Sequence, residues 1–378
     1  MMDKIELIIK HGHVIDPAQN INQIMDIAVS NGQIMAIEST IEVEKGQQII
    51  DAKDLYVVPG LIDLHTHIYW GATSLSVNPN DIYRRSGITT FVDAGSAGAG
   101  NFLGLSEYVI KPNLFNVFSF LNISFPGIFA VSQHVNIGEA SFLELMSIEE
   151  AINICQQYPE SIVGIKARAC QRAAKENGLV AIQLALEVAE QTKLPVMAHV
   201  GLNPPTITEV INLLRHGDIM THAFREAPNT FVTPDNKIKD CFYQAREKGI
   251  ILDIGHGAAG FSFRVAKCFA AQHIWPDTIS SDVHILNVDG PAYDLLTTMS
   301  KFLCLGMPLE KIIAAVTINA ANAIRKPQLG TLRIGHPADI TLFKMEQGDF
   351  HFIDGAQQSI QGNKKFKVIS LIKDGAIL

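Results

Sequence analysis

The sequence predicts an α/β protein: a (β/α)8 TIM barrel with a small β-sandwich domain formed by the N- and C-terminal segments. Through the middle of the chain, short apolar runs alternate with helical stretches, as in parallel sheets covered by helices. Both ends instead carry short alternating runs separated by turn residues, which is typical of antiparallel strands. We therefore expect residues 1–55 and 330–378 to form a composite sandwich and residues 56–329 to form the barrel.

Composition excludes several classes of protein. The chain has 378 residues, 47% of them hydrophobic and only 18% charged, so a disordered chain is excluded and a large core is expected. A net charge of −8 argues against nucleic-acid binding. No apolar run is long enough to span a membrane, and the first residues are too charged for a signal peptide. Five scattered cysteines indicate reduced thiols, so we expect a cytoplasmic protein.

The two ends are expected to share one sheet. The strand-like runs near the N-terminus are LIIKHGHVID, DIAVSNGQIMAIE and QQIIDAKDLYVV, and those near the C-terminus are GTLRIGHPADITLF, HFIDG and FKVISLIKDGAIL. Two independent flaps are the alternative. One shared domain is favoured because neither end is long enough to bury a core alone.

The middle of the chain contains eight apolar runs that are candidate barrel strands. Their anchors are Leu61, Thr89, Val117, Val163, Val196, Ile219, Ile251 and Ile279. The clearest intervening helix covers residues 171–193, where apolar residues recur at steps of three and four. The longest step between anchors includes residues 125–147, rich in Gly, Ser and His, which we interpret as an active-site loop or lid.

Metal-binding and charged residues stand at the ends of these runs. The carboxyl ends of barrel strands converge on one mouth, where catalytic groups collect. The residues in question are His65, His67, Lys166, Arg168, His199, His222, His256 and Asp282. His65 and His67 are two positions apart, so both point the same way from a strand and can bind one metal ion together. Nitrogen and oxygen ligands of this kind suit zinc, with manganese or iron as alternatives.

Lys166 is an unusual member of this set, because an ammonium group has no lone pair for a metal ion. Burial beside cations lowers the pKa of a lysine, and the neutral amine can add CO2 to form a carbamate. A carbamate is an anionic oxygen ligand able to bridge two metal ions. An ordinary ion pair with an acid is the alternative, and the His-rich mouth favours the carbamate.

Arg168 lies two residues beyond Lys166, so we expect it to share the inward face of the strand. A guanidinium beside two dications requires a neighbouring anion. A substrate carboxylate held in a bidentate fork could provide that charge. A carboxylated Lys166 or a nearby acidic residue is an equally good source.

The combined motifs resemble the amidohydrolase superfamily. The resemblance is carried by VVPGLIDLHTH, by the lysine of GIKAR, by the two single histidines and by the SSD of the eighth run; GTLRIGHPADITLF resembles that family's return into a β-sandwich. The segments HIYWGATSL, DAGSAGAGNF and GIKAR resemble a dihydroorotase-like subgroup labelled dihydroorotase, adenine deaminase or deacetylase. Members of that subgroup can cleave acetyl esters of α-hydroxy acids such as mandelate.

The resemblance implies a binuclear centre that uses two divalent metal ions, zinc above all. His65, His67 and Asp282 would hold the buried ion, and His199 and His222 the outer one. Carboxylated Lys166 and a hydroxide would bridge the two ions, and Asp282 would carry the proton to the leaving group. Arg168, His256 and Tyr69 are the candidate substrate contacts, although His256 could instead only brace the seventh strand.

The function expected from this resemblance is hydrolysis of an ester or amide, with a small acylated hydroxy or amino acid as substrate. Opening of a cyclic amide, as by a dihydroorotase or hydantoinase, is the alternative. Adenine deamination is disfavoured by Lys166, and a non-catalytic scaffold by the complete ligand set. We also expect a substrate that carries a carboxylate, and a homo-oligomer.

Overall fold

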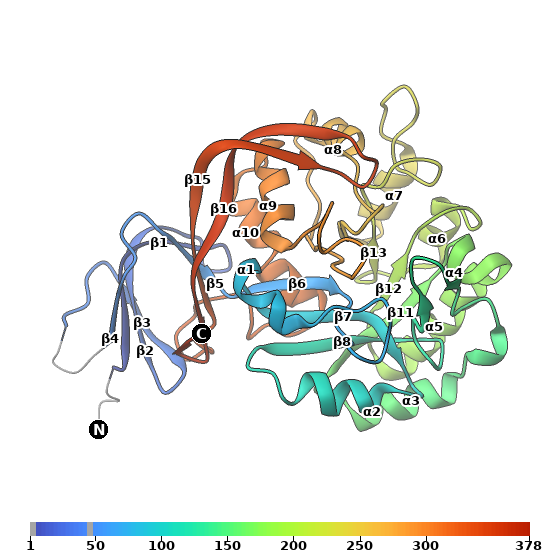
Figure 1. Cartoon of the computed structure of the whole chain (residues 1–378), viewed down its shortest axis with the longest axis horizontal. Coiled ribbons are helices and arrows are strands. Elements are labelled where there is room, and N and C mark those ends of the chain that lie inside the picture. Colours follow the sequence, from blue (N-terminus) through green and yellow to red (C-terminus); the bar gives the residue numbers. More distant parts are fainter. Residues whose placement is uncertain (1–4, 44–47) are drawn as a thin grey trace.

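A seven-stranded parallel sheet forms the centre of the computed structural model, which describes residues 5–43 and 48–378 (Figure 1). Along the sheet the order is β6-β7-β8-β11-β12-β13-β14, with every neighbouring pair parallel. The strands are β6 (Leu61–Thr66), β7 (Ile88–Gly98), β8 (Asn116–Asn122), β11 (Ile162–Arg168), β12 (Val196–His199), β13 (Ile219–Thr221) and β14 (Ile251–Leu252). All residues of β6 and β7 are buried, as in a sheet covered on both faces. Seven of the eight expected runs are therefore confirmed as parallel strands.

The eighth run, anchored on Ile279, forms no regular strand, and in this respect the prediction was wrong. Residues 278–283 nevertheless bridge both edges of the sheet, because Thr278 pairs with Asp253 beyond β14 and Val283 pairs with Thr66 of β6. The backbone leaves the extended conformation at Asp282, whose φ is 47°. The segment is thus held by a few contacts to each edge instead of by a continuous ladder.

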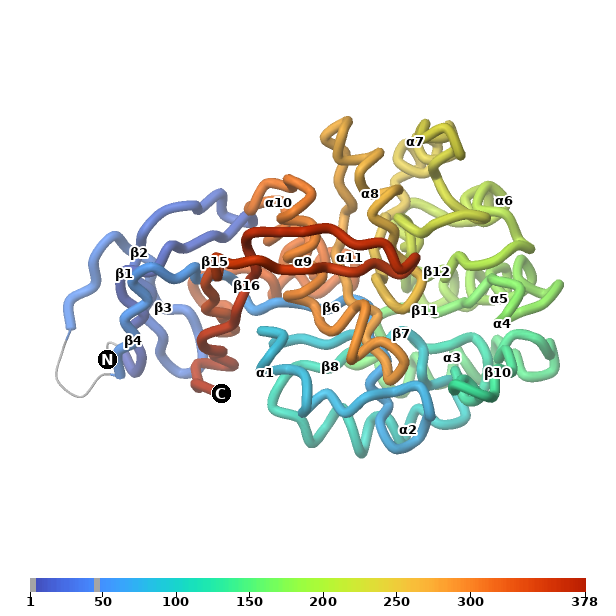
Figure 2. Tube along the Cα trace, turned by 45° about the horizontal axis from the view of Figure 1, so that its top comes forward, coloured from blue at the N-terminus to red at the C-terminus, as the bar shows by residue number. Residues whose placement is uncertain are grey.

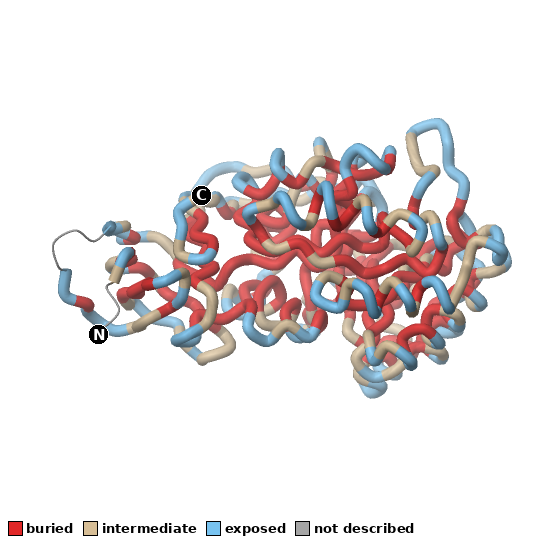
Figure 3. Tube along the Cα trace, turned by 90° about the horizontal axis from the view of Figure 1, so that it is seen from below, coloured by how far each residue is buried: buried red, intermediate tan, exposed pale blue. Residues whose placement is uncertain are grey.

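Helices cover the outside of the parallel sheet (Figure 1). The α-helices are α1 (Tyr83–Ser86), α2 (Phe102–Leu105), α3 (Ile148–Gln157), α4 (Gln171–Ala174), α5 (Gly178–Thr192), α6 (Ile207–Leu213), α7 (Asp240–Glu247), α8 (Phe263–Ala270), α9 (Leu295–Cys304), α10 (Leu309–Ala315) and α11 (Ile318–Ala323). Short 3-10 turns lie at η1 (Pro79–Asp81), η3 (Leu143–Leu145) and η4 (Lys175–Asn177), and a π turn at η2 (Ser106–Ile110). Buried residues follow the central strands, and exposed ones lie on the outer helices and loops (Figure 3).

The helix expected over residues 171–193 is broken into α4 and α5. The break lies at Lys175, whose φ of 49° is incompatible with a continuous helix. The Asn177 amide also donates to Ser141 O at 3.1 Å, which ties the break to the 125–147 segment. The amphipathic pattern itself is confirmed, because Ile182 is buried and Glu187 is exposed.

The two ends of the chain share a second sheet, as predicted. Its strand order is β17-β16-β15-β5-β1-β2-β3, and β4 pairs with β1. The strands are β1 (Leu7–Asp16), β2 (Ile21–Ser30), β3 (Gln33–Glu38), β4 (Gln48–Asp51), β5 (Tyr56–Pro59), β15 (Ile340–Ile353), β16 (Ser359–Lys373) and β17 (Ala376–Ile377). The first residue of the expected run 47–58 lies outside the described residues, and the rest of the run contains β4 and most of β5. Both ends also contribute to one apolar cluster that includes Ile9, Val14, Leu332 and Ile372.

The long hairpin β15–β16 extends from this second sheet across helix α9 (Figures 1 and 2). The Phe366 N–H donates to Ser300 Oγ at 3.0 Å, and Lys301 Nζ donates to Ile353 O at 2.7 Å. The hairpin therefore joins the terminal sheet to the outside of the barrel. Among the described residues, no helix combines the length and the apolar character needed to cross a membrane.

Candidate metal centre

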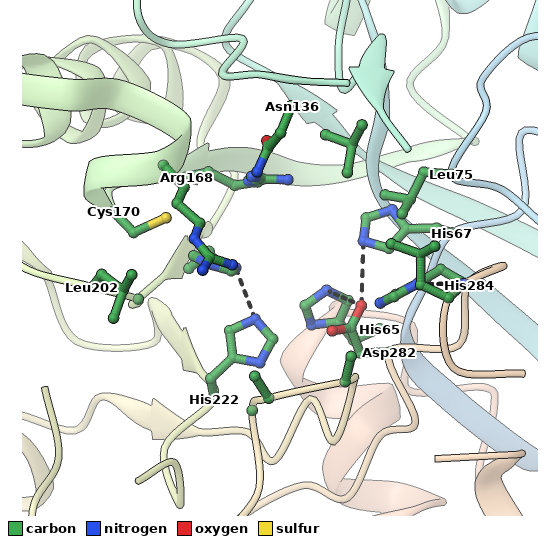
Figure 4. A pocket seen from close by; sticks show the side chains of 18 of the residues that line it. His65, His67, Leu75, Asn136, Arg168, Cys170, Leu202, His222, Asp282 and His284 are labelled. Atoms are coloured by element: carbon green, nitrogen blue, oxygen red, sulfur yellow. Dashed lines mark hydrogen bonds and ion pairs between the residues drawn. The ribbon is translucent and has the colours of Figure 1, made fainter. Parts of the chain in front are cut away.

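The expected metal ligands converge on one pocket of about 640 Å³ at the carboxyl ends of the parallel strands. His65, His67, His222 and Asp282 point toward its middle (Figure 4). Lys166 and His199 also line it. All six side chains that sequence reasoning singled out as ligands therefore lie together, as strand ends in a barrel predict.

Three of these side chains form a compact cluster. The Nε2 atoms of His65 and His67 each lie 3.3 Å from Oδ1 of Asp282, and all three residues are buried. Asp282 Oδ1 has no hydrogen-bond partner within the described chain. A buried carboxylate oxygen left without a donor is costly unless a cation completes its surroundings. Two imidazole nitrogens and a carboxylate oxygen are a donor set that fits zinc.

Hydrogen bonds behind the cluster orient both histidines and fix the tautomer of His65. Thr221 Oγ1 donates to Asp253 Oδ2 at 2.7 Å, so it must accept from Nδ1–H of His65 at 2.8 Å. The lone pair of His65 is therefore on Nε2, which faces Asp282. Nδ1 of His67 lies 2.9 Å from Ser96 Oγ, which holds the ring from behind. Such outer contacts orient metal-binding histidines and raise their basicity.

Burial keeps these imidazoles neutral, which metal binding requires. Desolvation is the largest cause that lowers the pKa of His65 well below its usual range, and it lowers the pKa of His67 to about 3. The pKa of His222 is lowered to about 3, again mainly by burial. These side chains therefore offer lone pairs instead of positive charge at neutral pH.

His199 and His222 form a second pair on the other side of the pocket. His199 Nδ1 and His222 Nε2 lie 2.8 Å apart. His222 donates from Nδ1 to Gly255 O at 2.7 Å, so its Nε2 carries the lone pair. The His222 backbone has a φ of 65°, a left-handed conformation that is rare outside glycine and often found at functional sites.

Lys166 lies beside His65 in the same pocket and is fully buried. Its Nζ is 3.3 Å from His65 Nε2 and 3.4 Å from Met197 Sδ. Desolvation is the main cause that lowers the pKa of Lys166 to about 8. No described carboxylate comes within ion-pair distance of it, so the ordinary ion pair considered above is not formed. Gly95 leaves room for its stem, because a Cβ there would lie 2.7 Å from Lys166 Cβ.

Arg168 has an acidic neighbour that sequence reasoning did not identify. Its Nε lies 3.2 Å from Oε1 of Glu139, which is 1% exposed. The two atoms are within ion-pair distance, but neither Arg168 Nε nor Glu139 Oε1 forms a hydrogen bond within the described chain. Glu139 belongs to the 125–147 segment, which also contributes Ser132 and Asn136 to the pocket wall. The interpretation of this segment as an active-site loop is supported, and a protein acid already balances Arg168.

Two of the predicted substrate contacts do not reach the pocket. Tyr69 is buried in the core, and its hydroxyl donates to Asn101 O at 2.8 Å. His256 is fully buried, with Nε2 at 2.7 Å from Lys301 Nζ, and neither residue lines the pocket. Lys301 Nζ also donates to Pro291 O at 2.7 Å. His256 therefore braces the structure behind the site, which is the second of the two roles considered for it.

Other pocket residues were missed from the sequence. His284 lines the wall with its ring centroid 6.1 Å from that of His67, and burial lowers its pKa to about 4. Its position two residues after Asp282 repeats the spacing of the first histidine pair and could have identified it. Arg172 and Arg225 also line the pocket, but Arg172 lies on the single-turn helix α4 and Arg225 on a connecting segment, and neither is long enough or regular enough for a periodic pattern to indicate the direction of a side chain.

Comparison with known proteins identifies the family. Residues 56–378 match the model of the amidohydrolase family, so the chain belongs to that family and is a hydrolase. It is 36% identical over 324 residues to the deacetylase Atu3266 of Agrobacterium fabrum, covering 86% of this chain and 79% of that protein. It is 32% identical over 375 residues to a deacetylase of Enterococcus faecalis, covering 98% of each.

Solved structures support the same assignment of the fold. A crystal structure described as a dihydroorotase has a TM-score of 0.91 and 32% identity, with 99% of each chain covered. One described as an adenine deaminase also has a TM-score of 0.91, with 31% identity over 99% of this chain and 100% of the other. These names differ in the reaction they specify, and all of them fall within the dihydroorotase-like and deacetylase group that the motifs predicted.

Proposed function

We propose that this protein is a binuclear metal-dependent hydrolase that removes the acyl group from a small acylated hydroxy or amino acid. One observation carries the proposal: the His65–His67–Asp282 cluster, with its unpartnered carboxylate oxygen, adjoins a fully buried lysine that has no acidic partner within ion-pair distance among the described residues. The relatives that are named deacetylases support an acyl group as the part removed.

The ligand assignment follows from the donor atoms. His65, His67 and Asp282 would hold one ion, and His199 and His222 the other, with zinc favoured and manganese or iron as alternatives. Lys166 would bridge the two ions as a carbamate. In that reaction the neutral Nζ would form an N–C bond to CO2, one C=O π bond would open to give the carboxylate, and the N–H proton would pass to water. A buried base without an acidic partner among the described residues would thereby become an anionic ligand.

The chemistry divides between the metal ions and the chain. Ions bound here would lower the pKa of water and polarise the scissile carbonyl. The chain provides the proton transfer, in which Asp282 accepts a proton at Oδ2, the oxygen that does not face the two histidines, and passes it to the leaving oxygen or nitrogen. The neutral His65 keeps its Nε2 lone pair toward Asp282. The 125–147 segment contributes Ser132 and Asn136 to one wall of the pocket.

Opening of a cyclic amide is the second candidate function. The observation that favours it is the similarity to the structure described as a dihydroorotase. Ring opening and deacetylation share the attack of water on an acyl carbon and differ in whether the leaving group stays attached. Adenine deamination, which the second solved structure suggests, would require attack on an aromatic carbon with loss of ammonia.

We further propose that the chain ends, residues 1–55 and 330–378, form a β-sandwich domain apart from the barrel of residues 56–329. The separate apolar cluster that contains Ile9 and Ile372 supports this division. We also propose a homo-oligomer in the cytoplasm, consistent with the composition.

A product assay on metal-loaded protein tests the reaction type. We expect acetate from O-acetylated hydroxy acids or N-acetylated amino acids, at a kcat/KM at least ~100-fold above that for dihydroorotate, hydantoins or adenine. Elemental analysis should find about two divalent ions per active chain. Preferred ring opening or ammonia release would overturn the deacetylase proposal, and full activity with one ion would overturn the binuclear one.

The carbamate has its own test. Protein loaded with metal under 13CO2 should show a carbamate carbon signal by NMR, which Lys166→Met should abolish together with part of the metal content. Lys267→Met, at an exposed lysine on α8, is the matched control and should keep both. A signal that survives in Lys166→Met would place the carbamate elsewhere.

A further inference from the structure

We propose that Arg225 is the residue that holds the carboxylate of the substrate, and that Arg168 is a positioning residue paired with the protein's own Glu139. This inference rests on the proposed function and names the subsite within it. The substrate class is an acylated hydroxy or amino acid with its free carboxylate next to the scissile acyl group.

The pocket has a surplus of positive charge. Among the described residues that line it, Lys166, Arg168, Arg172 and Arg225 are basic, and Asp282 is the one carboxylate. A carboxylated Lys166 would no longer carry a positive charge. The positive charge of Arg168 is balanced by Glu139, which does not itself line the pocket. Two guanidiniums, those of Arg172 and Arg225, have no described acid within ion-pair distance. The positive charge that no acidic side chain balances therefore lies at these two arginines.

Arg225 is the buried member of this pair, with only 9% of its surface exposed, whereas Arg172 is exposed at the rim. Nη1 of Arg225 donates to Val200 O at 2.8 Å, but its Nε has no hydrogen-bond partner in the described chain. A buried guanidinium without a counter-ion is costly, since one carbonyl dipole does not compensate a full charge. An anion bound in the pocket would provide the missing partner.

The location of Arg225 suits the carboxylate of the proposed substrate. Its backbone N–H donates to His222 O at 3.3 Å, and its guanidinium is tied to Val200, the residue after His199. The side chain is thus held beside the two outer histidines. In such a substrate the scissile acyl carbon is three bonds from the carboxylate carbon, so a carboxylate bound there would direct the acyl group toward the metal centre. Arginine suits this role because its planar fork matches a carboxylate.

Arg168 has a different environment. The buried Glu139 already provides its counter-charge, so a substrate carboxylate would have to compete with a fixed ion pair. Its expected function is to hold the 125–147 segment against the fourth strand of the barrel. Loss of this pair should disturb acidic and neutral substrates alike.

A matched pair of substrates separates the two arginines. With O-acetylmandelate and its methyl ester, Arg225→Met should lower kcat/KM for the acid by about 10- to 100-fold and change that for the ester less than ~3-fold. Arg225→Lys should recover only part of the loss, because lysine lacks the fork. Arg168→Met should reduce both substrates by similar factors. Circular dichroism and metal content show whether each variant is folded and loaded.

Equal losses of acid and ester in Arg225→Met would overturn the inference, as would a selective loss of the acid in Arg168→Met alone. A binding measurement keeps the test independent of the reaction. By calorimetry on metal-free protein, mandelate should bind wild type at least ~10-fold more tightly than Arg225→Met, and methyl mandelate should not distinguish them. If wild type cleaves neither ester but mandelate binding still requires Arg225, the proposed function fails and the subsite stands. If mandelate binding is unaffected by Arg225→Met, the subsite fails.

Discussion

Asp282 combines a strained backbone with an unsatisfied buried oxygen. Its φ is 47°, and its Oδ1 faces the two histidine nitrogens without any hydrogen bond. Its carbonyl accepts from Asn287 Nδ2 at 2.7 Å, and its N–H donates to His65 O at 2.7 Å, so the backbone is held from both sides. Strain of this kind persists only where surrounding contacts enforce it.

Replacement of this residue should separate proton transfer from metal binding. We expect Asp282→Asn to lower kcat by at least ~100-fold, because the amide keeps the size of the side chain but cannot accept the proton. Part of the metal should remain, since the histidines are unchanged. The measurement is kcat beside metal content. A near-normal rate in fully loaded protein would show that another group moves the proton.

Individual site residues could be predicted where the strand geometry alone determines their direction. His65 and His67 were predicted correctly to point at one place, because the alternation of β6 still holds at His67, the first residue after the strand. Tyr69 follows the end of β6, where that alternation no longer applies, and it turns into the core. Glu139 and Arg225 depend on loop conformation, which a period in the sequence does not encode.

At the scale of elements, β7 makes room for Lys166 through Gly95. Gly95→Ala should lower both metal content and activity, by about 10-fold or more, because the new methyl group would lie 2.7 Å from the Cβ and Cγ of a side chain that cannot move away. Gly71→Ala is the matched control. Both glycines have a φ of 85°, but the space around Gly71 is open, so the control carries the backbone strain without the contact.

The comparison of Gly95→Ala with Gly71→Ala separates the steric effect on Lys166 from backbone strain. Backbone strain alone would make them equally damaging to metal content, which would contradict a packing role for Gly95. Thermal unfolding of metal-free protein measures the strain by itself.

The ion pair between Glu226 and Arg264 links the segment after β13 to helix α8. Arg264 Nε donates to Glu226 Oε2 at 2.9 Å, and Ser262 Oγ donates to the same oxygen at 2.9 Å. The hydrogen bond from Arg264 is the largest cause that lowers the pKa of Glu226 to about 2 from its ordinary value of 4.5. A depressed carboxyl pKa stabilises the fold above the unfolded value and loses that effect as pH falls toward the folded one.

Glu226→Gln should therefore lower stability by about 1 kcal/mol near neutral pH. The difference from wild type should shrink as pH falls from about 4.5 toward about 2. Unfolding of metal-free protein at several pH values is the measurement. Glu160→Gln, at a side chain that is 93% exposed, is the control and should show little change at any pH. A difference for Glu226→Gln that is constant with pH would contradict the assignment.

The elements themselves were predictable to different degrees. Seven parallel strands followed from apolar runs, because strands covered on both faces must be apolar throughout. The eighth run has the same apolar start but continues with Ser280 and Ser281, whose hydroxyls bond to Asp253 and Asp63. These side-chain hydrogen bonds hold the segment in place of the continuous backbone hydrogen bonds of a regular strand. The break between α4 and α5 was not predicted because the apolar period lies within α5, and nothing in the sequence of residues 171–177 marks the left-handed conformation of Lys175.

At the scale of the whole molecule, Asp16 joins the two ends of the chain. Its Oδ2 accepts from the Leu332 N–H at 2.7 Å and from Thr331 Oγ1 at 3.0 Å, and it is fully buried. Asp16→Ala should lower the free energy of unfolding by about 2–4 kcal/mol, because it leaves buried donors without partners. Denaturant unfolding is the measurement, and the rate of the fully folded enzyme should be unchanged.

Asp51→Ala is the matched control for this prediction. Asp51 lies in the same sheet on β4 but is 65% exposed, so its loss should have a much smaller effect. Equal effects of the two replacements would show that the contact between the chain ends contributes little.

The shared sheet was predictable because neither end could bury a core alone. The path of the β15–β16 hairpin across α9 was not predictable, because the sequence of a long strand does not indicate where the strand leaves its sheet.

The division of one sheet between the two ends of the chain determines the order in which the protein can fold during synthesis. Pro59 of β5 pairs with Ile340 of β15, about 280 positions later in the chain. At ~5–20 residues per second, the N-terminal strands wait tens of seconds for their partner to leave the ribosome. During that time β5 presents an unpaired apolar edge, of the kind that recruits other strands. Slow production of the last third of the chain should therefore increase aggregation even though the finished enzyme is unaltered.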